Sequence, residues 1–236
     1  MRDVPLHIWI LFILTVISIV GFIYYAVNFA ARKDKNDNLP LIILTFVVIW
    51  LFSTAVLSFY DFFIHFDQLY RLILLIAIPL VLFLAPLADR KSRVFLHKMP
   101  LTTLTYIHIV RVPLEITFWW LAIDGIITAE MTFEGTNFDI LSGISAPFAA
   151  IFLVGLRSKS RIGASIWNLA ALGLSIYVFH TAISFSPYLL QGSGQASNYV
   201  LFRFPFVWVF GFVFPVIIAS HLISLFKIIG DPDPDY

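Results

Sequence analysis

The apolar and polar positions of this chain fall into long blocks. Seven predominantly apolar runs, separated by short polar segments, cover roughly residues 6–30, 39–62, 69–88, 100–123, 139–156, 163–186 and 204–227. A helix needs about 20 apolar residues to cross a hydrocarbon core about 30 Å thick. No period-two alternation is long enough for a membrane barrel, the other structure that satisfies its backbone in lipid. The pattern therefore predicts an all-α polytopic membrane protein, with residues 1–230 forming a single bundle of seven transmembrane helices.

Composition supports a membrane location and removes several classes of chemistry. Apolar residues make up 60% of the 236 positions and charged residues 12%, against about 45–50% and about 25% in soluble domains. A net charge of +1 gives no indication of a nucleic-acid partner. The lack of cysteine excludes disulfides, thiol nucleophiles and cysteine-ligated metals. The lipid bilayer is the predicted partner, and the cell (inner) membrane is the predicted location.

Lysine and arginine are concentrated in alternate connections. Eleven of them follow the first, third, fifth and seventh runs, whereas Arg2, Arg71 and Arg203 lie on the opposite side. Positively charged connections stay preferentially in the cytoplasm. This asymmetry predicts an outer N-terminus and a cytoplasmic C-terminus, with residues 231–236 as a short acidic cytoplasmic tail.

The fourth run, Pro100–Asp124, carries ionisable residues through its middle. His108, Arg111 and Glu115 fall within about 60° of one another at about 100° per residue, so they share one stripe of a helix. Each such group costs about 2.5 kcal/mol or more in mid-membrane and needs a partner. Pro113 lacks the backbone N–H of a regular helix and predicts a break beside this stripe. Two interpretations stay open: a functional site, or an intrahelical Arg111–Glu115 pair that only stabilises helix packing.

Two later runs offer polar partners at a similar depth. His221 in the last run and Asn168 in the sixth lie about as far from the cytoplasmic side as His108 does. We therefore expect an inner polar layer. The candidate ligand-binding residues are His108, Arg111, Glu115, Asn168 and His221. His108 and His221 would also supply the two axial nitrogens of a b-type haem, with Arg111 neutralising a propionate.

A second group of polar residues is expected at the outer mouth of the bundle. Carboxylates and imidazoles suit divalent cations, but their spacing here matches no defined metal motif, and a solvated acidic loop is the alternative. Asp139 is also expected to cap the fifth helix. Arg203 is expected to pair with a carboxylate on the outer side. The candidates are Glu130, Glu134, Asp139, His180 and Arg203.

The sequence leaves the function open among several classes. No lysine lies in the middle of the last run for a retinal Schiff base, and no P-loop, dinucleotide or GxSxG motif is present. The favoured hypothesis is a protein that binds or transports a small anionic molecule or protons. The alternatives are a haem- or metal-containing redox protein, an intramembrane enzyme with Glu115 or His108 as general base, and an accessory or structural subunit. Whether the protein is an enzyme is not decided.

Overall fold

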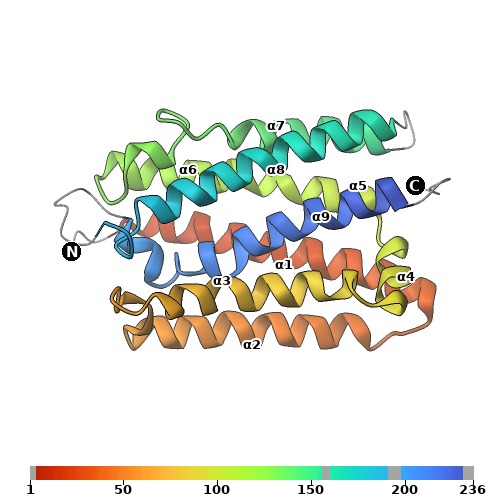
Figure 1. Cartoon of the computed structure of the whole chain (residues 1–236), viewed down its shortest axis with the longest axis horizontal. Coiled ribbons are helices and arrows are strands. Elements are labelled where there is room, and N and C mark those ends of the chain that lie inside the picture. Colours follow the sequence, from red (N-terminus) through yellow and green to blue (C-terminus); the bar gives the residue numbers. More distant parts are fainter. Residues whose placement is uncertain (1–3, 156–159, 191–197, 231–236) are drawn as a thin grey trace.

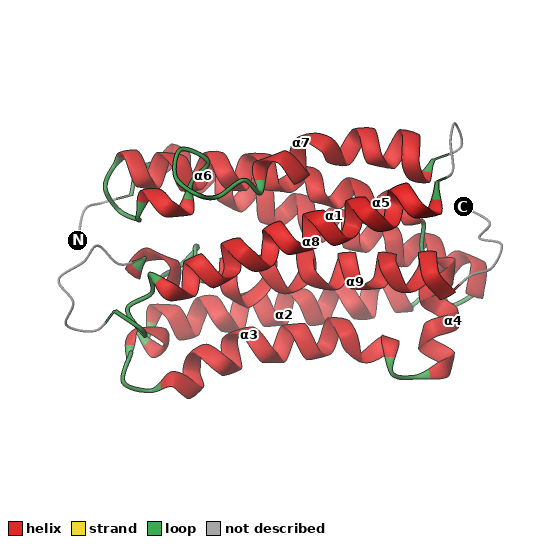
Figure 2. Cartoon of the chain, turned by 45° about the horizontal axis from the view of Figure 1, so that its top comes forward, coloured by secondary structure: helices red, strands yellow, loops and turns green. Residues whose placement is uncertain are grey.

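A computed structural model describes residues 4–155, 160–190 and 198–230. The predicted tail at 231–236 and two basic residues of the fifth connection, Arg157 and Lys159, lie outside the described residues. Within the described ranges every regular element is a helix and no strand is present (Figure 2). The predicted all-α class is therefore confirmed.

The helices run along a common long axis, and the short α4 lies across one end (Figure 1). The α-helices are α1 Leu6–Asp34, α2 Leu39–Phe59, α3 Leu69–Leu84, α4 Arg90–Lys98, α5 Leu101–Tyr106, α6 Arg111–Ile123, α7 Ile140–Ala149, α8 Arg161–Ser184 and α9 Phe214–Gly230. Short 3-10 turns connect or extend them at η1 Phe62–Ile64, η2 Ala85–Leu87, η3 Ile107–Val110, η4 Ala129–Met131 and η6 Tyr199–Phe202. Two π-helical turns, η5 Ala150–Val154 and η7 Val209–Val213, extend α7 and precede α9.

Length and hydropathy identify a multi-pass membrane protein. Six of the described helices are long and apolar enough to cross a bilayer, namely Leu6–Asp34, Leu39–Phe59, Leu69–Leu87, Leu101–Ile123, Arg161–Ser184 and Val209–Gly230. The helix at the position of the fifth predicted span, Ile140–Val154, is apolar but shorter. At about 1.5 Å per residue it extends for roughly 22 Å, less than the hydrocarbon thickness. Six long spans are thus supported, and the seventh stays a prediction.

The connections of the bundle meet at two opposite ends. At one end, Lys98 of α4 pairs with Asp34, and Arg161 Nη2 donates to the carbonyl of Ile228 at 2.7 Å. The first contact joins the connections after the first and third predicted spans, and the second joins the start of α8 to the end of α9. Basic residues that follow the first, third and fifth predicted spans therefore lie at a single end of the bundle.

The opposite end is closed by aromatic and polar contacts. Arg203 pairs with Asp61 at 3.2 Å. The hydroxyl of Tyr188 donates to the carbonyl of Phe63 at 2.8 Å, and burial raises the pKa of Tyr188 to about 12. The expected pairing of Arg203 with a carboxylate at this end is confirmed.

The core surrounds α9, which packs against α3, α5 and α8. Just before it, the chain buries a series of phenylalanines, and the rings of Phe202 and Phe210 stack with centroids 5.2 Å apart. Two indoles attach α2 to this segment: Trp50 Nε1 donates to the carbonyl of Gly211 at 2.6 Å, and Trp208 Nε1 donates to that of Leu51 at 3.0 Å. The final pass is consequently fixed at the centre of the bundle, where it presents its own polar side chains to the interior.

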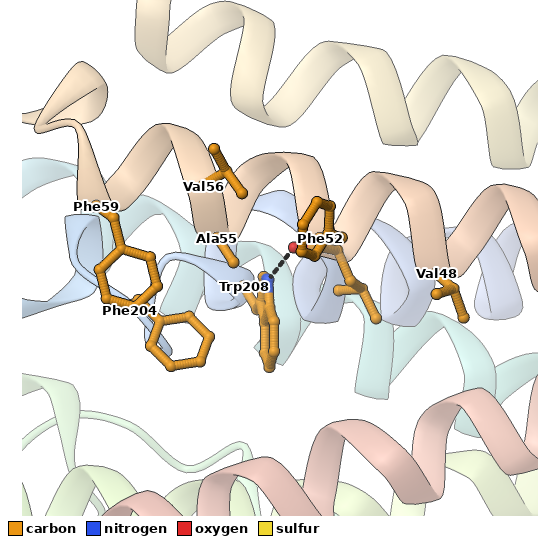
Figure 3. Close-up of a pocket in the computed structure, with 8 residues that line it drawn as sticks. Val48, Phe52, Ala55, Val56, Phe59, Phe204 and Trp208 are labelled. Atoms are coloured by element: carbon orange, nitrogen blue, oxygen red, sulfur yellow. Dashed lines mark hydrogen bonds between the residues drawn. The ribbon is translucent and has the colours of Figure 1, made fainter.

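An apolar groove of about 440 Å³ lies beside these indoles. Figure 3 shows residues of α2 on one side of it and two aromatic residues that precede η7 on the other. The lining residues are Val48, Leu51, Phe52, Ala55, Val56, Phe59, Phe204 and Trp208. The groove contains none of the ionisable residues of the fourth predicted span.

Candidate functional site

The fourth predicted span is broken where the sequence places its ionisable residues. Helix α5 ends at Tyr106, the 3-10 turn η3 follows, and α6 starts at Arg111. Pro113 lies at the third position of α6, where its missing N–H removes a hydrogen bond to the preceding turn. The break turns His108 and Arg111 toward α7, α8 and α9. The side chains of His108, Arg111 and Glu115 are all 0% exposed.

Arg111 contacts three other helices through its guanidinium. Nη1 donates to Asp139 Oδ1 at 2.8 Å, at the start of α7, and to the carbonyl of Ala171 in α8 at 3.2 Å. Nη2 lies 2.6 Å from Nε2 of His221 in α9. Nε is buried and has no hydrogen-bond partner among the described residues. The three contacts use three of the five N–H groups of the guanidinium, so Nε–H and the second N–H of Nη2 remain.

The intrahelical Arg111–Glu115 pair, one of the two interpretations that the sequence leaves open, is not formed. Arg111 pairs with Asp139, whereas Glu115 accepts from Asn137 Nδ2 at 2.7 and 2.8 Å. A reason lies in Gly143, because a Cβ there would lie 3.0 Å from the backbone N of Val112. The glycine lets the start of α7 approach α6 closely. The carboxylate of Asp139 is thereby placed against the Arg111 guanidinium, where Glu115 would otherwise have paired.

Asp139 also departs from its two sequence-based roles. It stands at the N-cap position of α7, but its carboxylate makes no cap hydrogen bond. It is 1% exposed, so it belongs to the interior and not to the outer mouth. Besides Arg111, it accepts from the hydroxyl of Ser175 in α8 at 3.4 Å. The carboxylate is therefore directed into the bundle, where Arg111 is the cation that binds it.

His221 is neutral, and its partners fix the position of its proton. A guanidinium can only donate, so Nε2 of His221 accepts from Arg111 and carries no proton. Asn168 donates through Nδ2 to the carbonyl of Ala164 at 2.9 Å, which leaves its Oδ1 to accept from Nδ1 of His221, also at 2.9 Å. The sequence-predicted neighbours Asn168 and His221 are thus in contact, and both ring nitrogens of His221 are used.

His108 stacks on His221 and makes one hydrogen bond. The ring centroids are 3.8 Å apart and the planes differ by 12°. The hydroxyl of Ser220 donates to the carbonyl of Ile217 at 2.8 Å, so Nε2 of His108, 3.2 Å from that hydroxyl, is the donor of their contact. Nδ1 of His108 is buried without a hydrogen-bond partner among the described residues. A second proton on Nδ1 would be a buried charge without a hydrogen-bond partner, stacked on a ring that contacts the Arg111 guanidinium, so His108 is also neutral.

This arrangement of the two histidines does not fit a b-type haem. Axial ligands direct one nitrogen each at the iron from opposite faces of the porphyrin. Here the two rings lie face to face with a 3.8 Å centroid separation, which leaves no space for a porphyrin between them. His221 has no free nitrogen for iron either. The stacking of the two rings and the hydrogen bonds of His221 therefore occupy the space and the nitrogen atoms that a haem would need.

Glu115 and Asp139 are linked through Asn137. Nδ2 of Asn137 donates to Glu115 and to the carbonyl of Met131, at 2.9 Å, while its Oδ1 accepts from the backbone N–H of Asp139, also at 2.9 Å. Every polar atom of this amide is therefore used, and the amide cannot rotate without losing bonds. Glu115 has no cation directly bonded to it.

The remaining outer-mouth candidates do not join the buried cluster. Glu130, Glu134 and His180 are exposed, and Arg203 is engaged with Asp61 and with the hydroxyl of Tyr199, at 3.1 Å. Among the described residues no group of three or more metal-ligating side chains is present. Their proposed roles in ligand or cation binding stay untested.

Sequence reasoning missed the two residues that complete the cluster. Asn137 lies in the connection before α7, close in sequence to the exposed Glu134, yet it is buried and donates to Glu115. Ser175 lies seven residues after Asn168 on α8, which places both on one helix face. That spacing was the available signal for Ser175, whereas only the fold brings Asn137 inward. Comparisons with protein-family models, with curated proteins and with solved structures find no match to this chain.

Proposed function

We propose that this membrane protein binds a small carboxylate-type anion at Arg111, in exchange for Asp139, and moves it together with a proton. The observation that carries the proposal is the single buried ion pair between these residues, formed through one carboxylate oxygen at 2.8 Å. A ligand carboxylate would make the same kind of charge-assisted bond to Nη1 of Arg111. The described conformation is then the ligand-free one, in which Asp139 occupies the anion position.

The exchange requires a proton for electrostatic reasons. An anion that displaces Asp139 leaves a second negative charge in a buried site, and an unpaired buried charge is costly. Uptake of one proton by the displaced carboxyl group restores the charge balance. Anion binding at Arg111 is thereby coupled to protonation.

The N-terminus lies outside and the C-terminus in the cytoplasm in this proposal. It is supported by the gathering of basic side chains at one end, where Lys227 Nζ donates to the carbonyl of His97 at 2.5 Å. The helix Ile140–Val154 then completes a seven-span bundle.

Ligand-dependent thermal unfolding of the purified protein tests anion binding. Acetate, succinate and inorganic phosphate serve as probes, because a ligand that binds the folded state raises the melting temperature. We expect at least one carboxylate to stabilise the wild type and to have no effect on Arg111→Gln. Arg71→Gln is the matched control, since Arg71 donates to the carbonyl of Phe62 at the bundle end, at 2.6 Å. Equal stabilisation of Arg111→Gln and wild type would refute the proposal.

A structural role is the second candidate, and a specific observation favours it. Arg111 joins α6 to α7, α8 and α9 with its own side chain. An accessory subunit needs such a connection for packing alone. If no probe alters the melting temperature of the wild type, this second function replaces the first.

A further inference from the structure

The buried cluster holds more acid than base. Glu115 and Asp139 are its two carboxyl groups, and Arg111 is its one permanent cation. His221 is neutral because its Nε2 accepts from Arg111, and His108 is neutral because a protonated Nδ1 would be a buried charge without a partner. With both carboxyl groups ionised, the cluster would carry one uncompensated negative charge.

No other described group near Glu115 compensates that charge. Arg111 lies one turn earlier on the same helix, and Asp139 is the acidic group presented by α7. Helix α1, which also packs along α6, has no Asp, Glu, Lys, Arg or His between residues 8 and 31. Glu130 of η4 is exposed. An isolated ionised carboxylate in such surroundings is strongly unfavourable, and the group is neutralised instead.

The hydrogen bonds distinguish the two carboxyl groups. Asp139 accepts a charge-assisted bond from Arg111 at 2.8 Å, which favours its ionised form. Glu115 accepts only from the neutral amide of Asn137. We propose that Arg111, Glu115 and Asp139 share one exchangeable proton, which resides on Glu115 while Arg111 is paired with Asp139. The assignment deepens the proposed function and rests on it for the role of that proton in transport.

Infrared difference spectroscopy of the purified protein in H₂O and D₂O detects such a proton directly. A protonated carboxyl group gives an isolated C=O stretching band above the amide bands that shifts in D₂O. We expect the wild type to show this band at neutral pH. Because Glu115 and Asp139 are the buried carboxyl groups among the described residues, its absence would overturn the proposal.

Charge balance predicts a characteristic response to substitution. Glu115→Gln removes the band. Asp139→Asn also removes it, because Glu115 then becomes the counter-ion of Arg111 and loses its proton. Arg111→Gln leaves two buried carboxyl groups without a cation, so the band area rises about twofold. A band that persists in both acid variants, or an unchanged area in Arg111→Gln, would contradict the shared proton.

A matched pair of variants assigns the proton to Glu115. Asn137→Leu removes the hydrogen bond to Glu115 and should raise the band frequency. Ser175→Ala removes the bond to Asp139 and should leave the band in place. The reverse pattern would place the proton on Asp139. These spectra need no anion, so a correct band pattern together with absent anion binding would refute the proposed function while the proton assignment stands.

Discussion

Arg111 lies at the point where the polar contacts of four helices meet. Its partners come from α7, α8 and α9, and its stack of neighbouring imidazoles is fixed by Asn168 and Ser220. A buried ion pair of this kind is costly to break, because the remaining partner must then be neutralised or find another counter-ion. We therefore expect the effects of substitutions at Arg111 and Asp139 on the free energy of unfolding to be strongly coupled.

We expect Arg111→Ala and Asp139→Ala each to lower the free energy of unfolding by about 3–5 kcal/mol. The double variant should lose clearly less than the sum, because neither member of the pair is left to be neutralised or paired again. The control is the exposed pair Arg203–Asp61, for which a coupling of about 0–1 kcal/mol is expected. Reversible denaturant unfolding in detergent measures both cycles, and additive losses at the buried pair would be inconsistent with this geometry.

Part of this arrangement follows from local rules and part does not. The helical period places His108, Arg111 and Glu115 on one buried face, and depth in the membrane brings Asn168 to His221. The partner of Arg111 is 28 positions away. Spacing of i, i+4 along one helix favours Glu115 as the partner of Arg111 instead of Asp139. Such local spacing contains no information on how two helices approach each other.

At the scale of elements, Gly143 determines how close α7 comes to α6. A Cβ at this position would lie 2.9 Å from Val112 Cγ2 and 3.1 Å from Cβ of Arg111. Small residues at such crossings are typical of membrane helices, which rely on close packing. The sequence predicts the broken fourth span from Pro113. The fifth span stays a prediction, because the described helix there, Ile140–Val154, is apolar but shorter than the other six.

Gly143→Ala should destabilise the protein by about 1–3 kcal/mol, because the methyl group pushes α7 away from the start of α6. Gly173→Ala in α8 is the control: a Cβ there meets nothing within 4 Å. Alanine improves helix propensity, so the control should be neutral or stabilised by up to about 1 kcal/mol. Thermal unfolding of the two variants decides this, and equal stabilities would exclude the close approach as the cause.

At the scale of the whole molecule, the basic residues and the charged cluster occupy different levels of the bundle. The basic connections gather at a single end, and the charged cluster lies inside the bundle between the two ends. Hydropathy predicts the membrane class and the long spans, because both depend only on the length and composition of each apolar run. The orientation stays a proposal from the charge asymmetry of the connections. The fold supports it only in bringing basic connections together at one end.

Single-cysteine labelling tests the orientation, and the chain has no cysteine of its own to interfere. Lys33 and Glu134 are both exposed and belong to connections on opposite sides. A membrane-impermeant maleimide should label Glu134→Cys in intact cells and Lys33→Cys only after permeabilisation. The opposite pattern would invert the proposed topology.

The pH dependence of carboxylate binding tests the central claim most directly. Between about pH 6.5 and pH 8.5 a carboxylate probe such as acetate stays ionised. If the bound anion replaces Asp139 with uptake of one proton, the dissociation constant of the wild type should fall about tenfold for each unit decrease in pH. Glu115→Gln combined with Asp139→Asn leaves no carboxyl group to protonate, so its binding should be tight and independent of pH. A wild-type dissociation constant that does not change with pH would contradict the exchange of Asp139 for a bound anion.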